Sequence, residues 1–464
     1  MDQRASYPHP ASASFPVPED VPPAAPVAPA QDLAPKAWLA LAILTACFAF
    51  AFTDRQILNL MVDPMKRDFA VTDKQIGFLM GPAFTITYVL VGLFAGYCAD
   101  RYNRRNLLLF AGTLWSLATV ATAIASNYET MVVTRLIVGA SEAFLFPSGM
   151  SLVAEMFDRR RLPIATTIYL TAPYIGGGLA LIVGGTVIGY TGAMKPILLP
   201  IGMMHGWQVA IAIVGVLGAV PILALLAIPE PVRGALAQAD DDMRSFGFLE
   251  GTGYMLKRWR FFVMFFLGIS FVSILLNTVP AWAPTMFTRQ YGMSATHVGL
   301  IYGILILVIG ILAGLCSPAI NRLIAKRHFD APMRTVLIGP MLLIVFGALL
   351  LLAPGAGVAM ACIALITFGY VVPLPMAGVS LQLATPPRLR GLSAAYYFVI
   401  VSVIGVGIGP MLVPFVTDNL LHDEHRLNTA IGMVTIACEI VALALLWCAF
   451  RGFSAERRAQ GAAV

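Results

Sequence analysis

The chain has 464 residues, of which 59% are hydrophobic and only 12% are charged, and its mean hydropathy is +0.82. Soluble domains carry about 25% charged residues, so this composition excludes an ordinary cytosolic enzyme and intrinsic disorder over most of the length. The formal charge of +6 does not indicate nucleic-acid binding, because the basic residues stand in short clusters between long apolar stretches. The six cysteines lie in apolar runs without metal-ligand spacing, so we expect no disulfide framework and no bound metal.

Residues 1–35 come before the first apolar stretch. They hold nine prolines and eight alanines, and they lack the charged segment and the continuous apolar core of a signal peptide. A segment of this composition cannot bury a core of its own, so the sequence predicts a disordered cytoplasmic tail. A binding motif for a partner within the tail is the alternative.

Twelve apolar stretches follow, each long enough to cross a bilayer of about 30 Å as a helix. We place them at 37–61, 75–99, 105–126, 130–154, 163–189, 206–228, 261–286, 296–320, 333–353, 357–383, 391–415 and 429–450. The sequence therefore predicts an all-α membrane protein with an N-terminal bundle at 36–228 and a C-terminal bundle at 261–450, each of six helices. A cytoplasmic linker at 229–260 joins the bundles, and a second tail occupies 451–464.

The distribution of Lys and Arg predicts the orientation. The tails and the segments that follow spans 2, 4, 6, 8 and 10 hold 22 of the 30 basic residues. Six lie on the other side, and Arg55 and Arg135 lie within spans. Because basic loops stay in the cytoplasm, we expect both termini there and the protein in the plasma (inner) membrane. Twelve helices in two similar halves are typical of a secondary transporter, and we expect it to be a monomer.

The segment between spans 2 and 3 places a glycine four residues before an Asp-Arg step and ends in a basic pair. Its candidate residues are Gly96, Asp100, Arg101, Arg104 and Arg105. This spacing resembles the signature of the major facilitator superfamily. We expect Gly96 to let two helices approach closely and Asp100 to belong to a cytoplasmic latch between the two halves. Asn103 stands where that family usually has glycine, and asparagine tolerates the positive φ of a tight turn. The alternative is a basic cluster with a single counter-ion.

Charged groups inside a membrane cost about 3 kcal/mol or more unless they are paired or hydrated, so each is a functional candidate. The spans hold five: Asp54 and Arg55 in span 1, Arg135 and Glu142 in span 4, and Glu439 in span 12. Arg135 and Glu142 are seven residues apart, so they share one face of their helix. Asp54 and Arg55 point about 100° apart, so we expect one to face helix 4 and the other the central cavity.

Two acids and two bases sum to zero charge, and protonating one acid unbalances them by one unit. A buried carboxylate beside an arginine is able to titrate near neutral pH, which a proton-coupled carrier needs. Asp54 and Glu142 are therefore the candidate proton-coupling residues. Arg55 and Arg135 are their counter-charges and candidate ligands for an anionic head group. A static ion pair that joins helices 1 and 4 is the alternative, and the role of Glu439 stays open.

Short segments in the first half of the chain resemble the Spinster family more narrowly. They are Thr53–Leu58, Pro64–Lys66, Gln75–Leu79 and Gly139–Ala143 followed by Pro147, which together with Gly96–Arg105 cover about residues 36–190. Spinster proteins in animals export sphingosine-1-phosphate and lysophospholipids, so the resemblance implies an amphipathic, anionic, lysolipid- or sphingolipid-like substrate. That family's helix 1 Asp-Arg pair and helix 4 glutamate are implicated in proton coupling and gating. By resemblance those roles pass to Asp54, Arg55 and Glu142.

The sequence thus predicts a proton-coupled secondary transporter with the major facilitator fold, in which two bundles alternate between two states. Its partners are a small-molecule or lipid substrate, protons and the bilayer, and we expect no cofactor and no nucleic acid. The alternative is a proton-driven exporter of other amphipathic metabolites or drugs, since the fold does not encode the substrate. A non-transporting sensor comes third. No histidine lies in the middle of a span and no phosphate-binding loop is present, so the sequence indicates neither an intramembrane enzyme nor ATP-driven transport.

Overall fold

The computed structural model describes residues 34–158, 160–191, 197–199, 202–228, 230–231 and 248–459. Twelve helical segments in these ranges are long and apolar enough to cross a membrane. They are Lys36–Leu60, Asp73–Arg101, Arg104–Ala123, Tyr128–Met156, Leu162–Thr191, Gly206–Ala227, Trp259–Arg289, Ala295–Ala325, Ala331–Leu351, Ala356–Ala384, Arg390–Leu421 and Leu427–Ser454. The twelve predicted spans are confirmed. Span 11 runs to Leu421 instead of 415, because the backbone continues as a π-helix through the polar Asp418 and Asn419.

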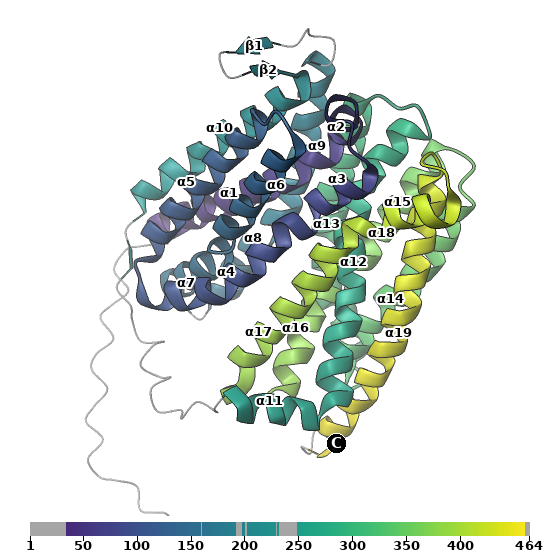
Figure 1. The fold of residues 1–464 in the computed structure, drawn as a ribbon. Helices are drawn as coiled ribbons and strands as arrows, with labels where there is room; N and C mark the ends of the chain where they lie inside the picture. Colours follow the sequence, from purple (N-terminus) through teal and green to yellow (C-terminus); the bar gives the residue numbers. More distant parts are fainter. Residues whose placement is uncertain are drawn as a thin grey trace, which may run out of the picture.

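The first six spans form one bundle, drawn in purple to blue-green in Figure 1. Its elements are α1 (Ala34–Ile57), η1 (Leu58–Leu60), α2 (Val62–Phe69), α3 (Asp73–Met80), α4 (Pro82–Arg101), α5 (Arg104–Ala123), α6 (Tyr128–Glu142), α7 (Leu145–Met156), α8 (Leu162–Leu170), α9 (Ala172–Thr191), β1 (Ile197–Leu199), β2 (Gly202–Met204), α10 (Gly206–Ala224) and η2 (Leu225–Ala227). The two short strands pair antiparallel, with Leu198 opposite Met203.

The last six spans form the second bundle, drawn in teal to yellow in Figure 1. Its elements are α11 (Phe248–Lys257), α12 (Trp259–Arg289), α13 (Ala295–Ala325), α14 (Ala331–Leu351), α15 (Ala356–Val371), α16 (Pro373–Ala384), η3 (Pro387–Leu389), α17 (Arg390–Val401), η4 (Ser402–Ile408), α18 (Gly409–Val416), η5 (Thr417–Leu421) and α19 (Leu427–Ala459). The elements η4 and η5 are π-helical, and the other η elements are 3₁₀ turns.

Prolines divide three spans of the first bundle into two helices each. Pro82, Pro147 and Pro173 lie in the first turns of α4, α7 and α9. A proline has no N–H to donate and its ring clashes with the carbonyl four residues earlier, so the preceding helix ends there. In span 4 this break directly follows Glu142, the last residue of α6. The break therefore places a charged side chain at an irregular point inside the membrane-spanning segment.

The segments predicted to lie outside the bundles are only partly described. Of the predicted tail at 1–35, only the last two residues belong to the described ranges, and α1 begins with them. Residues 232–247 of the predicted linker also lie outside the described ranges, whereas its last part contains the helix α11. The final helix α19 runs to Ala459, well into the predicted tail at 451–464. The domain boundaries themselves stay a prediction.

The two bundles meet at one end of the molecule, which we call the hairpin end because it carries α2 and the strands β1 and β2 (Figure 1). The opposite end, which carries α11 and the α4–α5 turn, is called the linker end. At the interface α9 packs along α13, α3 packs against α18, α4 against η4, and η1 against α12. Close backbone contacts make this possible: a Cβ added to Gly178 would lie 2.8 Å from the carbonyl oxygen of Gly303.

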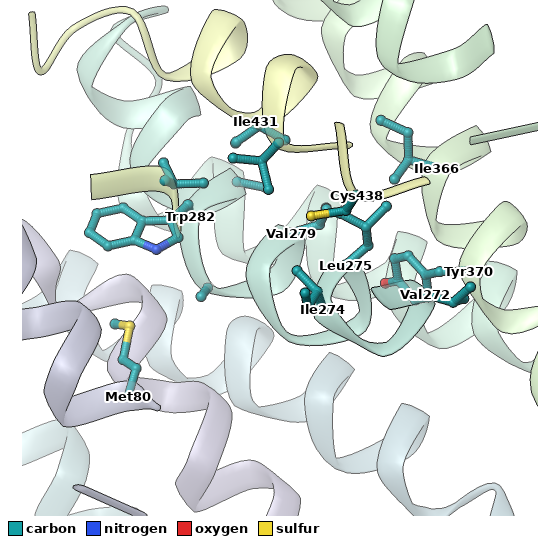
Figure 2. Close-up of a cluster of buried hydrophobic side chains, with 14 of the residues drawn as sticks. Met80, Val272, Ile274, Leu275, Val279, Trp282, Ile366, Tyr370, Ile431 and Cys438 are labelled. Carbon is teal, nitrogen blue, oxygen red and sulfur yellow. The ribbon is translucent and has the colours of Figure 1, made fainter. Parts of the chain in front are cut away.

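Among the described residues, one cluster of buried apolar side chains crosses between the bundles. It joins Ile57 and Met80 of the first bundle to Trp282 and Val413 of the second. Figure 2 shows part of it, with Met80 on the side of Trp282. The indole nitrogen of Trp282 also donates to the Pro410 carbonyl at 2.8 Å, which fixes the ring in place. The core of the second bundle therefore continues into the first.

Candidate functional site

Two buried ion pairs join α1 to α6. Nη1 of Arg135 donates to Oδ2 of Asp54 at 3.1 Å, and Nη2 of Arg55 donates to Oε2 of Glu142 at 2.6 Å. Asp54 and Arg55 point about 100° apart on α1, yet both reach α6, and which of them faces the central cavity stays a prediction. The acids and bases are crossed between the helices. Each arginine side chain is long enough to reach from its own helix to the carboxylate of the opposite helix, which lies at a different level along the helix axis.

Burial distinguishes the four side chains. Asp54 is fully buried, and Arg135 and Glu142 are 2% and 3% exposed. The side chain of Arg55 is 14% exposed, the largest value in the group. A new ligand that approaches these charges therefore meets Arg55 first. Removing one partner of a buried pair strands the other charge, so the four groups depend on one another.

The pairs leave hydrogen-bonding capacity unused. Oδ1 of Asp54 and Oε1 of Glu142 have no hydrogen-bond partner in the part of the chain that the structure describes, and the same holds for Nε of Arg55 and for Nε and Nη2 of Arg135. Buried polar groups are normally satisfied, and exceptions often mark sites where water or a ligand binds. These free atoms give the site room for a proton on either acid and for an anion on either base.

Three aromatic rings surround the guanidinium of Arg55. Its central carbon lies 4.1 Å from the ring centre of Phe84, 4.6 Å from that of Phe52 and 5.5 Å from that of Tyr88. A cation near ring faces is stabilised by the ring quadrupole, by about 0.5–2 kcal/mol for a partly desolvated pair. The rings also give an apolar surface directly beside a positive charge. This combination suits a molecule with an anionic head and an apolar body.

Gly139 brings α4 close enough to place two of these rings. A Cβ at Gly139 would lie 2.2 Å from the Phe84 carbonyl oxygen and 2.7 Å from the Thr87 hydroxyl. That hydroxyl donates to the Leu136 carbonyl at 2.6 Å, which ties the two helices at the same level. Gly139 lies between Arg135 and Glu142 on the sequence of α6. Only a glycine at this position lets α4 approach α6 closely enough to place Phe84 and Tyr88 beside Arg55.

The basic pair of the motif between spans 2 and 3 binds residues of the first bundle and of the segment that directly follows span 6. Arg104 is 1% exposed, and its Nε lies 2.8 Å from Glu230, while its Nη1 lies 3.3 Å from Glu155. The backbone N–H groups of Arg104 and Arg105 also donate to the Glu230 carboxylate. The predicted latch between the two halves is therefore not formed by this pair in the structure. The basic pair instead joins the start of α5 to the segment that follows span 6.

The remaining residues of the motif lie at the linker end. Asp100 and Arg101 are exposed, and the Arg101 guanidinium stacks over Tyr97 at 4.4 Å. Apart from its chain neighbours and the backbone of its own helix, no described atom lies within 4 Å of a Cβ built on Gly96, so the close approach of two helices expected there is not present in this structure. Asn103 has φ −62° and accepts a hydrogen bond from the N–H of Asn106. It therefore serves as the N-cap of α5, and the positive φ expected for it is wrong.

Glu230 lies outside the spans, and its surroundings favour the ionised form. Burial by itself would raise the pKa of this carboxyl, but hydrogen bonds from the Arg105 and Arg104 backbone and from the Arg104 guanidinium hold the pKa below its ordinary value. The two N–H groups belong to the first turn of α5, where the helix dipole also favours a negative charge. The Glu230 carboxylate is therefore a structural anchor for this turn.

Sequence reasoning missed an ion network at the hairpin end. Seven side chains form it, and we call it the hairpin-end network: Asp63, Lys66, Asp73 and Lys74 from the first bundle, and Arg289, Asp418 and Glu424 from the second. One signal was present in the sequence. Three of its members are basic residues on the side of the membrane where basic residues are scarce. The signal does not single these residues out, because Arg67 and Arg426 lie on the same side of the membrane and outside the network.

Glu439 stands apart from all of these groups. It is fully buried in α19, and both of its carboxyl oxygens lack a hydrogen-bond partner among the described residues. The helix α19 packs on α12 and α14, away from α1 and α6. The structure therefore brings four of the five charges within spans together and leaves the fifth alone.

Comparison with known proteins identifies relatives along most of the chain. The family model described as Major Facilitator Superfamily matches residues 44–410. An "MFS-type efflux pump" of Mycolicibacterium smegmatis is 24% identical over 429 residues, covering 89% of this chain and 92% of the relative. "Protein spinster" of Drosophila melanogaster is 22% identical over 416 residues, covering 86% of this chain and 65% of the relative. The resemblance to Spinster proteins is thereby confirmed.

Solved structures share the fold. A bacterial homolog of the human lysosomal transporter Spinster, in an inward-facing and unoccupied conformation, superposes with a TM-score of 0.75 at 20% identity, covering 91% of this chain and 98% of the other. A D-xylose-proton symporter superposes with a TM-score of 0.67 at 16% identity, covering 87% and 97%. The predicted architecture of two six-helix bundles is confirmed.

Proposed function

Because the chain belongs to the Major Facilitator Superfamily, it is a transporter rather than an enzyme, and we propose that it is a proton-coupled secondary transporter of an amphipathic, anionic, lysolipid- or sphingolipid-like substrate. Asp54 and Glu142 carry the coupling protons, and Arg55 and Arg135 are their counter-charges. The substrate moves by alternating access of the two bundles. The observation that carries this proposal is the pair of crossed, buried ion pairs, with Arg55 as the most accessible of the four charges.

The arrangement supports a link between anion binding and protonation. An anionic head group that binds Arg55 competes with Glu142 for the same guanidinium. When Glu142 loses its counter-charge inside the membrane, the ionised carboxylate is strongly disfavoured and a proton binds. Anion binding at Arg55 and protonation of Glu142 therefore favour each other. The bound anion then offsets Arg55, the protonated Glu142 is neutral, and Asp54 offsets Arg135. The total charge of the site is again zero.

The surroundings of Arg55 support an amphipathic substrate. The head group needs a cation able to form two parallel hydrogen bonds, which a guanidinium supplies. The rings of Phe52, Phe84 and Tyr88 lie around the same guanidinium and offer an apolar surface to the rest of the molecule. The resemblance to Spinster proteins also supports an amphipathic, anionic substrate.

Charge distribution supports the orientation. We place the linker end in the cytoplasm and the hairpin end outside the plasma (inner) membrane, because 22 of the 30 basic residues lie in the tails and in the segments on the linker side. The bundles meet at the hairpin end, and the chain superposes well on a structure described as inward-facing. The conformation is then open toward the cytoplasm, and the latch that includes Asp100 and Arg101 forms when the linker end closes.

Proton flux in proteoliposomes tests the proposal. Vesicles that contain the purified protein and a pH-sensitive dye receive an anionic lysophospholipid or a sphingoid phosphate. We expect a proton flux that Glu142→Gln abolishes, while Glu129→Gln, an exposed residue of the same helix α6, leaves it unchanged. A flux that persists in Glu142→Gln contradicts the assignment of the proton to this carboxylate.

A second candidate function is the export of other amphipathic metabolites or drugs. It is favoured by the similarity to an "MFS-type efflux pump" over 89% of the chain. The same assay separates the two candidates. A flux evoked by cationic drugs and not by the anionic lipids supports the export of drugs, since a cation does not compete with Glu142 for Arg55.

A further inference from the structure

The hairpin end holds all the ion pairs that join the two bundles in the described ranges of the chain. Arg289 contacts Asp63 and Asp73, Lys66 contacts Glu424, and Lys74 contacts Asp418. Each of the other ion pairs described joins two side chains of the same bundle, where the segment directly after span 6 is counted with the first bundle. The charged contact between the bundles is therefore concentrated at one end, and a motion that separates this end must break it.

Arg289 is the centre of the network. Its Nη1 and Nη2 lie 2.7 Å and 3.0 Å from the two oxygens of Asp73, and its Nε lies 2.6 Å from Asp63. Three nitrogens of one guanidinium thus bind two carboxylates of the opposite bundle. A bidentate pair of this kind combines charge with fixed geometry and is among the stronger polar contacts in proteins.

Burial divides the network into a core and a rim. The Arg289 side chain is 8% exposed and that of Asp73 is 1% exposed. In the pair of Lys74 with Asp418 the side chains are 47% and 26% exposed, and Glu424 opposite Lys66 is 52% exposed. Exposed pairs contribute little because water and salt screen them. The contact that holds the bundles together electrostatically is therefore the one between Arg289 and Asp73, with Asp63 beside it.

The backbone approaches closely just below this network. A Cβ on Gly81 would lie 2.5 Å from the Gly407 carbonyl oxygen, and one on Gly77 would lie 2.9 Å from the Pro410 carbonyl oxygen. Both contacts join the first bundle to the second, since α3 packs on α18 and α4 on η4. The bundles therefore fit together at the hairpin end both by shape and by charge.

We propose that Arg289 is the gating residue of the hairpin end: its ion pairs with Asp73 and Asp63 hold that end closed, and their rupture lets it open. The inference rests on the proposed alternating access, but it concerns the balance of two conformations in the absence of substrate. Without Arg289, Asp63 and Asp73 of the first bundle and Glu424 of the second lose their shared cation, and Lys66 stays paired with Asp73 and Glu424. The lost pairs between the bundles, together with the repulsion of Glu424 by the two carboxylates of the opposite bundle, favour separation of the bundles.

The distance between the two bundles at the hairpin end tests the proposal directly. Spin labels are attached to Arg67→Cys on α2 and His297→Cys on α13, two exposed positions on opposite bundles outside the network. The six native cysteines are first replaced, because they are free thiols. Distance distributions from pulsed electron paramagnetic resonance are then recorded without substrate. The unsubstituted network should give mainly the short distance of the closed hairpin end.

Arg289→Gln should raise the ratio of the open to the closed population by about tenfold or more, since it breaks a mostly buried pair. Arg426→Gln is the matched control, because Arg426 is an exposed arginine of the same bundle at the same end, outside the network. It should leave the distribution unchanged. Arg289→Lys should give an intermediate shift, since lysine keeps the charge but cannot form the bidentate pair.

An exchange of charges separates gating from a general loss of packing. Arg289→Asp combined with Asp73→Arg restores an ion pair with reversed polarity, and it should move the distribution back toward the closed form relative to either single variant. Identical distributions for Arg289→Gln, Arg426→Gln and the unsubstituted network would overturn the proposal. The distance measurement needs no substrate and no proton flux. A negative result would therefore count against the gating role of Arg289 alone, and not against the proton-coupling role of Glu142.

Discussion

The guanidinium of Arg55 is bound by the Glu142 carboxylate at 2.6 Å, and its central carbon lies 4.1 Å from the centre of the Phe84 ring. The carboxylate comes from α6 and the ring from α4, so three helices of one bundle meet at a single charge. A substrate head group that takes the place of Glu142 keeps the ring contact. The exchange of anions that we propose would therefore leave the apolar surface of the rings in place.

Removal of the Arg55 charge should discriminate between substrates by their charge. We expect Arg55→Ala to weaken the binding of anionic lysolipids by about tenfold to a hundredfold, the size of a hydrogen bond to a charged group, and neutral amphiphiles much less. Arg55→Lys should lie between, because lysine lacks the planar fork. Binding is measured by displacement of a fluorescent lysolipid. Equal losses for both classes of ligand would argue against a head-group role.

The pair of Asp54 with Arg135 should behave as a unit in stability measurements. Asp54→Asn leaves a buried arginine without its counter-charge and should cost about 3–5 kcal/mol, and Arg135→Met should cost a similar amount. The double variant should cost clearly less than the sum, because it removes both charges. Thermal unfolding in detergent gives the three values. Strict additivity would mean that the two side chains do not interact.

Gly139 and Gly96 offer a matched test of the packing argument. Gly139→Ala places a methyl group 2.2 Å from the Phe84 carbonyl oxygen, so α4 and α6 must separate, at a cost of about 1–3 kcal/mol. That movement also withdraws Phe84 from Arg55 and should lower transport. Gly96→Ala meets no described atom within 4 Å beyond its chain neighbours and its own helix backbone, and it should not lower stability, since alanine favours the helix over glycine by about 0.5–1 kcal/mol. Both variants are compared by thermal unfolding and by proton flux.

The Glu230 anchor predicts a dependence of stability on pH. Its folded pKa lies below its unfolded value near 4.5, so the ionised group stabilises the fold above that pH, and the stabilisation is lost as the pH falls through the folded pKa. Glu230→Gln should therefore lower the unfolding temperature at pH 7. The difference from the natural protein should shrink as the pH falls below about 4.5. A difference that is constant with pH would show that the charge contributes nothing.

The hydrophobic pattern determined the twelve membrane spans. A helix of about 20 apolar residues must form to satisfy its backbone inside a bilayer, so the twelve spans are local properties of the chain. The same principle singled out Asp54, Arg55, Arg135 and Glu142, since any charge in a span is an exception that requires a partner. The polar residues of span 11 misled the prediction of its end, because helix geometry continued through Asp418.

Only the tertiary structure decided which partners meet. The crossing of the two ion pairs depends on the offset between α1 and α6, which spacing along either helix does not contain. Asp63 and Arg289 are 226 residues apart, and nothing in their local sequence pairs them. The basic pair after span 2 binds Glu230 because the segment leaving span 6 passes the start of α5. Hydrophobic transfer acts on each span separately, whereas an ion pair needs two side chains within a few ångströms, and packing of the bundles alone fixes that distance.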